Sequence, residues 1–186
     1  MRCSFPAIVS GLLLLTASAL QAQGPAEDWQ AVLRSRLPLY GHRNWIVVAD
    51  SAYPAQSRAG IETVVANADQ LTVLKAVLQM IGDSKHVQPI IYLDKELASL
   101  HDSEVPGIST YKQQLQGLTR GREPQSLLHD EIISKLDSVS QTFRVLIIKT
   151  NMTMPYTSVF LQLDCAYWGP EQERKLRAAM NQQTAR

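Results

Sequence analysis

The chain has 186 residues, with 18 basic and 17 acidic side chains and a formal net charge of +1. A chain of this length forms one domain with a substantial core, and interspersed charges close to neutrality give no reason to expect binding to nucleic acid or to an anionic membrane surface. The two cysteines, Cys3 and Cys165, do not make a disulfide framework, because Cys3 lies in a segment that we expect to be removed.

That segment, residues 1–22, has the order of a secretory signal peptide. Arg2 precedes an apolar run over residues 8–15, and small residues follow. A positive start, an apolar middle and a small-residue cleavage site are typical of an export signal, and the run is shorter than the roughly 20 residues of a membrane-spanning helix. We therefore expect residues 23–186 to be exported, to the periplasm or outside the cell, as a single domain with no membrane segment left after cleavage.

The first half of the mature chain predicts a helix, two strands, a helix and a strand. Apolar residues recur every three or four positions over 26–37 and again over 68–82, which indicates helices. Residues 45–49, 61–66 and 89–93 are short apolar runs, typical of strands that are covered on both faces. A glycine is expected to end each helix, at Gly41 and Gly82.

The second half continues the alternation. Residues 94–120 are polar and mostly helical by pattern, and residues 125–141 predict another helix. Strands are predicted over 144–150 and 158–164, separated by a short turn that would allow an antiparallel pair, and a polar helix over 170–180 closes the chain. Together these elements predict an α/β domain of three layers, with helices on both faces of a largely parallel, mixed sheet.

The chemistry of the chain is not carried by a common motif. The sequence contains no phosphate loop, dinucleotide fingerprint or serine-nucleophile elbow, and its four histidines lack the spacing of metal ligands. Polar groups instead flank the predicted strands, where ligands bind in open α/β sheets. His42 precedes the first strand, Asp50 follows it, and Tyr156 begins a polar turn before the last strand. Each residue also has an ordinary structural explanation. His42 could be a cation at a helix end, Asp50 a turn former, and Tyr156 a packed aromatic ring.

The stretch LPLYGHRNWIVVADSAYPAQS, residues 37–57, resembles the D-ribose pyranase / L-fucose mutarotase family, the RbsD/FucU-like proteins. That family opens with a short helix, then Gly-His, an apolar strand, Asp and a loop that contains Pro; the loop here is nearer the fucose type. Residues 68–82 and 89–93 match the next helix and strand, and MPYTSVFLQL, residues 154–163, looks like the closing Pro-Tyr turn and strand. The resemblance covers roughly residues 30–164.

This resemblance implies an isomerase that interconverts anomers, or pyranose and furanose rings, of a free monosaccharide. Opening the ring requires a proton delivered to the ring oxygen and another removed from the anomeric hydroxyl; histidine is well suited to both steps, and no metal or organic cofactor is required. The resemblance makes His42 the proton donor. The sugar contacts that it implies are Asp50, His129, Tyr156, Thr157 and Ser158.

The sequence also departs from the family pattern. Ser158 stands where the family has Asn, Ser51 stands where it has Ala, and the export signal and the C-terminal helix are additional. These departures leave two other hypotheses open beside the enzyme. One is a non-catalytic protein that binds or senses a monosaccharide on the same scaffold, and the other is a structural oligomer subunit without a ligand.

His42 and Asp50 are eight residues apart, and most of that interval is predicted strand. An extended span of this length is on the order of 26 Å, far longer than a monosaccharide. We therefore predict an obligate homo-oligomer in which His42 of one subunit meets Asp50 of its neighbour. The resemblance implies the same arrangement, because the family forms ring-like oligomers with sites between subunits.

Overall fold

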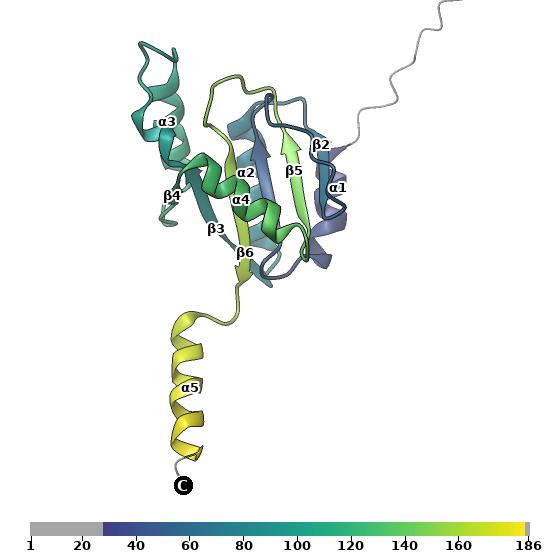
Figure 1. Ribbon diagram of the computed structural model, residues 1–186, viewed down its shortest axis with the longest axis vertical. Coiled ribbons are helices and arrows are strands. Elements are labelled where there is room, and N and C mark those ends of the chain that lie inside the picture. Colours follow the sequence, from purple (N-terminus) through teal and green to yellow (C-terminus); the bar gives the residue numbers. More distant parts are fainter. Residues whose placement is uncertain (1–27, 185–186) are drawn as a thin grey trace, which may run out of the picture.

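The computed structural model describes residues 28–184, and this part of the chain forms a six-stranded mixed sheet with helices on both faces (Figure 1). The strands are Trp45–Ala49 (β1), Ile61–Val65 (β2), Val87–Asp94 (β3), Gln125–Leu127 (β4), Val145–Lys149 (β5) and Val159–Cys165 (β6). The helices are Trp29–Arg36 (α1), Gln70–Asp83 (α2), Ile108–Leu118 (α3), His129–Val139 (α4) and Pro170–Thr184 (α5), with short 3₁₀ turns at Leu37–Leu39 (η1) and Lys95–Ser99 (η2). The predicted signal peptide lies outside the described residues.

The strand order across the sheet is β2-β5-β1-β6-β3-β4. Strand β1 pairs in parallel with β5, as do β2 with β5 and β3 with β4. Strand β6 lies between β1 and β3 and is antiparallel to both. The sheet therefore consists of two parallel groups of strands that are joined by one reversed strand, which confirms the predicted mixed α/β sheet.

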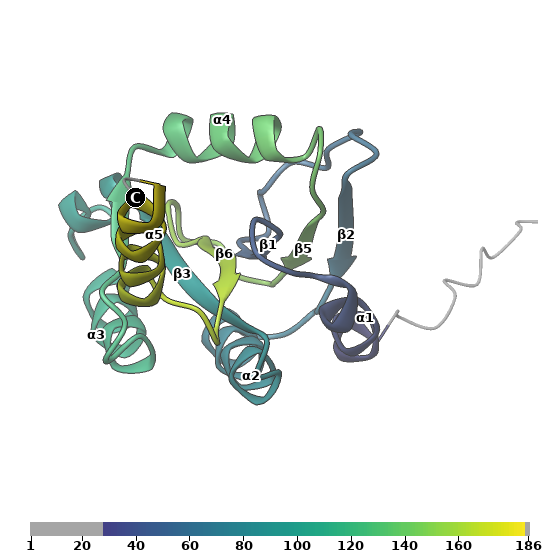
Figure 2. The same ribbon diagram turned by 90° about the horizontal axis from the view of Figure 1, so that it is seen from below.

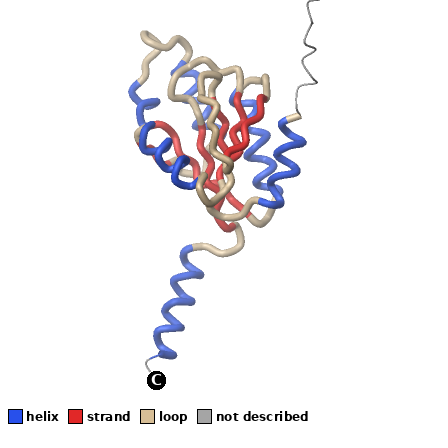
Figure 3. Tube along the Cα trace, turned by 45° about the vertical axis from the view of Figure 1, so that its right-hand side comes forward, coloured by secondary structure: helices blue, strands red, loops and turns tan. Residues whose placement is uncertain are grey.

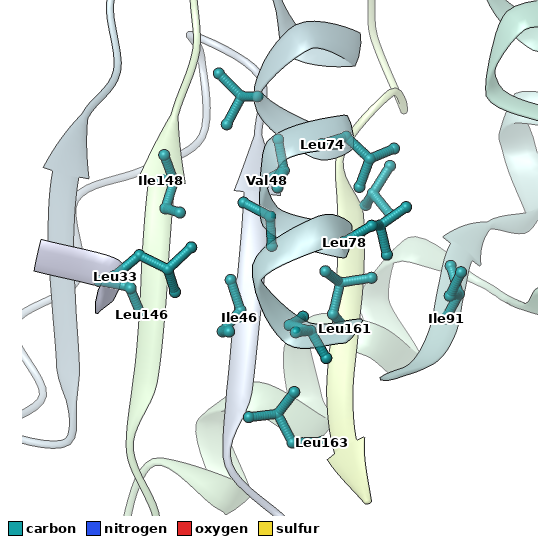
Figure 4. Close-up of a cluster of buried hydrophobic side chains, with 14 of the residues drawn as sticks. Leu33, Ile46, Val48, Leu74, Leu78, Ile91, Leu146, Ile148, Leu161 and Leu163 are labelled. Atoms are coloured by element: carbon teal, nitrogen blue, oxygen red, sulfur yellow. The ribbon is translucent and has the colours of Figure 1, made fainter. Parts of the chain in front are cut away.

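Helices α1, α2 and α3 cover one face of the sheet, and α4 covers the other (Figure 2). Strand β1 is buried at every position because both of its faces are covered. Figure 4 shows the larger core, in which side chains of α1 and α2 pack on β1, β5 and β6. The smaller core, under α4, includes Trp45, Val47, Tyr92, Ile132, Leu136 and Phe160.

Helix α2 shows how the sequence specifies one of these layers. The Asp69 carboxylate caps its first turn by accepting from the Thr72 backbone N–H at 2.9 Å. Leu74, Leu78 and Ile81 then recur at helical spacing on the buried side. Burial of each such side chain contributes about 1.5–3 kcal/mol to the free energy of unfolding, so the amphipathic pattern fixes which face of α2 meets the sheet.

One predicted element was wrong in part, and one open alternative is decided by the structure. Residues 125–141 were predicted to be one helix, but the first three form the edge strand β4 and the helix begins at His129. The antiparallel pair that the short turn would allow does not form, since β6 inserts between β1 and β3, and β5 pairs with β1 and β2. Short-range sequence pattern could not show this, because both of the β6 partners are distant in sequence.

The predicted helix ends also need correction. Helix α1 stops at Arg36, and the Leu37–Leu39 3₁₀ turn, with Pro38, separates it from Gly41. Helix α2 continues through Gly82 to Asp83, and the cap residue is Ser84. In both places the chain leaves the α-helix without a left-handed glycine.

Helix α5 extends away from the domain beyond β6 (Figures 1 and 3). It begins at Pro170, as predicted, and carries Glu171–Lys175 and Glu173–Arg177 ion pairs one turn apart, at 2.9 and 2.7 Å. Local charge pairing therefore supports a helix that the domain itself does not cover. Within residues 28–184, none of the helices has both the length and the apolar composition needed to cross a membrane.

Candidate functional site

Polar side chains gather at one end of the sheet, where the parallel strands finish and the reversed strand β6 begins; this end of the strands is the candidate edge. Because β6 is antiparallel, its first residues lie at the edge where the parallel strands end. Asp50 follows β1, Asp94 ends β3, His129 follows β4, and Ser158 immediately precedes β6. Residues separated by more than 100 positions in the sequence thus reach the edge at which ligands bind in open α/β sheets.

Asp50 is held at this edge by Ser158. The Ser158 hydroxyl donates to Asp50 Oδ2 at 2.8 Å and accepts from the Asp50 backbone N–H at 3.1 Å. The other carboxylate oxygen, Oδ1, accepts from the Ala52 backbone N–H at 2.9 Å. Both oxygens are therefore oriented by hydrogen bonds, and the half-buried carboxylate keeps lone pairs that can accept from a ligand hydroxyl.

The turn before β6 is supported from below by a buried polar network. The Thr157 carbonyl accepts from the Tyr111 hydroxyl at 2.6 Å and from the side-chain amide of Gln70. The same Gln70 accepts from the Thr150 hydroxyl at 3.1 Å. The Thr157 side chain is itself buried, and its hydroxyl donates to the Met154 carbonyl at 2.7 Å. In the single chain, Thr157 and Ser158 thus hold the turn, while their neighbour Tyr156 is exposed at its tip.

Tyr156 and His129 form the accessible part of the edge. Tyr156 has a left-handed backbone, with φ of 57°, and 38 % of the residue is exposed. Its ring forms a T-shaped pair with the His129 ring, at a centroid distance of 5.7 Å and an interplanar angle of 80°. The structure therefore brings Asp50, His129 and the Tyr156–Ser158 turn to one edge of the sheet, through side chains from three different connections.

The sequence interpretation missed Asp94, the acidic residue at the end of β3. Its Oδ1 lies 3.2 Å from His129 Nδ1, and the residue is 2 % exposed. Burial raises the pKa of this carboxyl from its ordinary value to about 6, although His129 opposes that rise. The signal was present in the sequence, since Asp94 follows the apolar run PIIYL just as Asp50 follows WIVVA.

His42 lies at the opposite end of the strands from the candidate edge, in an exposed turn before β1. The turn is closed by the Asn44 backbone N–H, which donates to the Gly41 carbonyl at 3.2 Å, and by Arg43, whose φ is 74°. The whole of β1 separates His42 from Asp50. One chain therefore presents the histidine at one edge and the carboxylate at the other, as the interval between them in the sequence required.

No metal site accompanies these groups in the part of the chain that the structure describes. Within residues 28–184, no group of three or more His, Cys, Asp or Glu side chains is placed to hold a metal ion. The polar groups at the two edges are instead carboxylates, imidazoles and a phenol, which bind hydroxyl groups and transfer protons.

The fold and the position of the edge define a class of structure, the RbsD/FucU-like fold. Bacillus subtilis RbsD complexed with D-ribose is similar over 72 % of this chain and 92 % of that protein, with a TM-score of 0.52 and 18 % identity. The Streptococcus pneumoniae fucose mutarotase in complex with L-fucose is similar over 76 % of this chain and 97 % of that protein, with a TM-score of 0.50 and 19 % identity. FucU from Bifidobacterium longum is similar over 73 % of this chain and 94 % of that protein, with a TM-score of 0.51 and 17 % identity.

These similarities confirm, at the level of the fold, the resemblance that the sequence indicated. At such low identities they do not transfer an activity or a site residue. No protein-family model matches the sequence, and a search of curated proteins gives no match.

Proposed function

We propose that this protein is an exported monosaccharide mutarotase or pyranase that interconverts cyclic forms of a free sugar by acid–base ring opening. The observation that carries this proposal is the collection of Asp50, His129 and Tyr156 at one edge of an RbsD/FucU-like fold. Two of the similar structures contain free sugars, D-ribose in one and L-fucose in the other. A monosaccharide is the ligand class that fits a set of hydrogen-bonding side chains at this edge.

The proposed reaction needs groups that give and accept protons near neutral pH. Histidine has an ordinary pKa in that range, and a positioned imidazole can protonate the ring oxygen while a second group takes the proton of the anomeric hydroxyl. In the proposal His42 is the proton donor, and Asp50 holds sugar hydroxyls as a hydrogen-bond acceptor. Tyr156 and His129, which are accessible, line the same pocket, and Thr157 and Ser158 keep its closing turn in place.

The proposed pocket needs two copies of the chain. His42 and Asp50 lie at opposite ends of β1, so one monosaccharide cannot contact both in one subunit. We propose a homo-oligomer in which the His42 edge of one subunit meets the Asp50 edge of its neighbour. Refolding a mixture of inactive His42→Ala and Asp50→Ala chains should restore part of the activity, because some mixed interfaces contain both side chains. A monomer in light scattering, or no recovery in verified mixed oligomers, contradicts this arrangement.

The direct test of the function is exchange between sugar forms. Saturation transfer in proton NMR, with ribose, fucose, galactose and glucose, should show anomer or ring exchange above the buffer rate for at least one sugar. His42→Ala should abolish the enhancement. His101→Ala is the matched control, because it removes another exposed histidine outside the candidate site. If the wild-type protein leaves every sugar at the buffer rate, the enzyme is ruled out.

One observation favours a non-catalytic sugar-binding protein as the second candidate. Ser158, which occupies the position where the family has Asn, is 1 % exposed and is engaged with Asp50, so it does not extend toward a ligand in the single chain. Titration calorimetry separates the two candidates, since binding of a sugar without accelerated exchange identifies a binding protein.

Export is tested separately by intact mass. Protein recovered from the periplasm or the medium is expected to begin near Gln23 and to carry one free thiol, at Cys165. A mass that retains residues 1–22 contradicts signal cleavage.

A further inference from the structure

Asp94 is the most deeply buried carboxyl group at the candidate edge. It ends β3 with 2 % of the residue exposed, and its Oδ1 lies 3.2 Å from His129 Nδ1. Its other oxygen, Oδ2, is buried and has no hydrogen-bond partner among residues 28–184. A buried carboxyl group with only one hydrogen-bonded oxygen destabilises the folded protein. The presence of Asp94 at this position is therefore not explained by stability.

Asp94 contacts His129, which is also in contact with Glu96 and Tyr156. The His129 backbone N–H donates to both carboxylate oxygens of Glu96, at 3.1 and 3.2 Å. Its ring meets Tyr156 edge-on, and its Nδ1 faces Asp94. The side chain nevertheless remains 38 % exposed. The ring is therefore fixed in orientation, with Nδ1 turned into the protein and Nε2 on the side of the ring away from Asp94.

This contact selects the protonation state of each ring nitrogen. An ionised carboxylate can only accept a hydrogen bond, so Nδ1 must carry the hydrogen, and in the neutral ring Nε2 then carries the lone pair. Such an Nε2 accepts a proton and can later return it. Asp50 is less suited to that task, because Ala52 and Ser158 already donate to its two oxygens.

We infer that Asp94 is a positioning residue that turns His129 into the second acid–base group of the pocket, with Nε2 as the reacting atom. The inference rests on the proposed function and completes it. Ring opening delivers one proton to the ring oxygen and removes one from the anomeric hydroxyl, which are separate atoms of the sugar. His42 of the neighbouring subunit supplies the first proton, and His129 accepts the second; the two roles exchange when the ring closes.

The charges around the pair predict a pH dependence. Burial is the main cause that raises the pKa of Asp94 to about 6; His129 opposes the rise, and the acidic groups Glu96 and Asp50 add to it. The charge of Asp94 is also felt by the buried hydroxyls of Tyr53 and Tyr111. Once Asp94 is protonated it can donate to Nδ1, which moves the ring hydrogen to Nε2 and removes the base. The exchange rate should therefore fall as the pH drops through about 6.

The test is Asp94→Asn in the full-length mature protein, with Asp83→Asn as the control at an exposed carboxylate that ends α2. Asp94→Asn should lower kcat for sugar exchange on the order of 100-fold, with little change in KM, and should remove the acidic limb of the pH profile. The control should keep both. In a His129→Gln background, Asp94→Asn should cause no further loss, because its effect passes through the imidazole.

Two outcomes overturn the inference in an active wild-type protein: an unchanged kcat and pH profile in Asp94→Asn, or additive losses in the double variant. A third measurement needs no substitution. Nitrogen NMR of the neutral His129 ring should show the hydrogen on Nδ1, and a hydrogen on Nε2 overturns the inference. A wild-type protein without exchange overturns the proposed function and the catalytic role together, whereas the NMR measurement still decides whether Asp94 orients the ring.

Discussion

Replacing Asp94 with asparagine should make the folded protein more stable at the same time as it slows the proposed reaction. Burial raises the pKa of the Asp94 carboxyl from 3.8 to about 6, with His129 only partly opposing the rise. The folded protein thus binds the proton more tightly than the unfolded chain does. Between pH 3.8 and about 6 the folded state carries more protons, so stability decreases as the pH rises through that window.

The difference between 3.8 and about 6 corresponds to about 3 kcal/mol of destabilisation once Asp94 is ionised. Asparagine has nearly the same shape and no charge, so Asp94→Asn avoids that cost. It also weakens the contact with His129, which subtracts about 1 kcal/mol. The expected net gain in the free energy of unfolding is therefore about 1–3 kcal/mol at pH 8, and close to zero at pH 4, where the wild-type carboxyl is largely protonated.

Urea unfolding of the wild type, Asp94→Asn and the exposed control Asp83→Asn, each at pH 4 and pH 8, measures this difference. The control should stay within about 0.5 kcal/mol of the wild type at both values. An Asp94→Asn variant that is less stable than the wild type at pH 8 would refute the reasoning. An equal gain at pH 4 and pH 8 would do the same, because the gain would then not come from the charge.

Three further predictions concern the support of the site and the fold. Ser158→Ala removes the hydroxyl that both donates to and accepts from Asp50, and it should cost about 1–3 kcal/mol in urea unfolding and weaken sugar binding. A Cβ at Gly60 would lie 2.0 Å from a backbone oxygen at the end of α4, so Gly60→Ala should lower the free energy of unfolding by about 3 kcal/mol or more. Gly117 lies in open space within α3, so Gly117→Ala should raise the free energy of unfolding by about 0.5–1 kcal/mol. Both ring nitrogens of His86 face backbone carbonyls, which raises its pKa; the stability lost in His86→Ala should therefore be full below pH 6.5 and should shrink as the pH rises through the raised pKa of the folded state.

The sequence predicts most of the elements of the fold because their apolar patterns are long and regular. The continuous run over Trp45–Ala49 and the helical spacing over Gln70–Asp83 both correspond to buried elements. Strand Gln125–Leu127 was missed because it is three residues long, lies at the sheet edge and has two exposed side chains, so it has no core-facing alternation to detect. The place of β6 depends on pairing with strands far away in sequence, which no local pattern encodes.

The candidate site was predicted residue by residue from a resemblance, and its organisation was not. The resemblance indicates both Asp50 and Ser158, but their mutual hydrogen bonds depend on the reversed direction of β6. The sequence shows Asp94 only as an acidic residue after an apolar run, and its burial, which makes that carboxyl unusual, is visible only in the fold. The left-handed backbone of Tyr156 is likewise a property of the folded turn, since a tyrosine rarely adopts it without support from the surrounding structure.

The position of β6 also determines how late in chain order the fold can be completed. Among the strands of residues 28–184, β6 is the last in chain order although it lies in the middle of the sheet, so β2-β5-β1 and β3-β4 have no shared partner until the chain through Cys165 is available. Until then each group has an open edge of unpaired backbone groups next to an incomplete core. A chain that stops before β6 should therefore lack both the join between the two halves of the sheet and the turn that orients Asp50. In this topology the last of the described strands in chain order completes the scaffold and the candidate site in a single step.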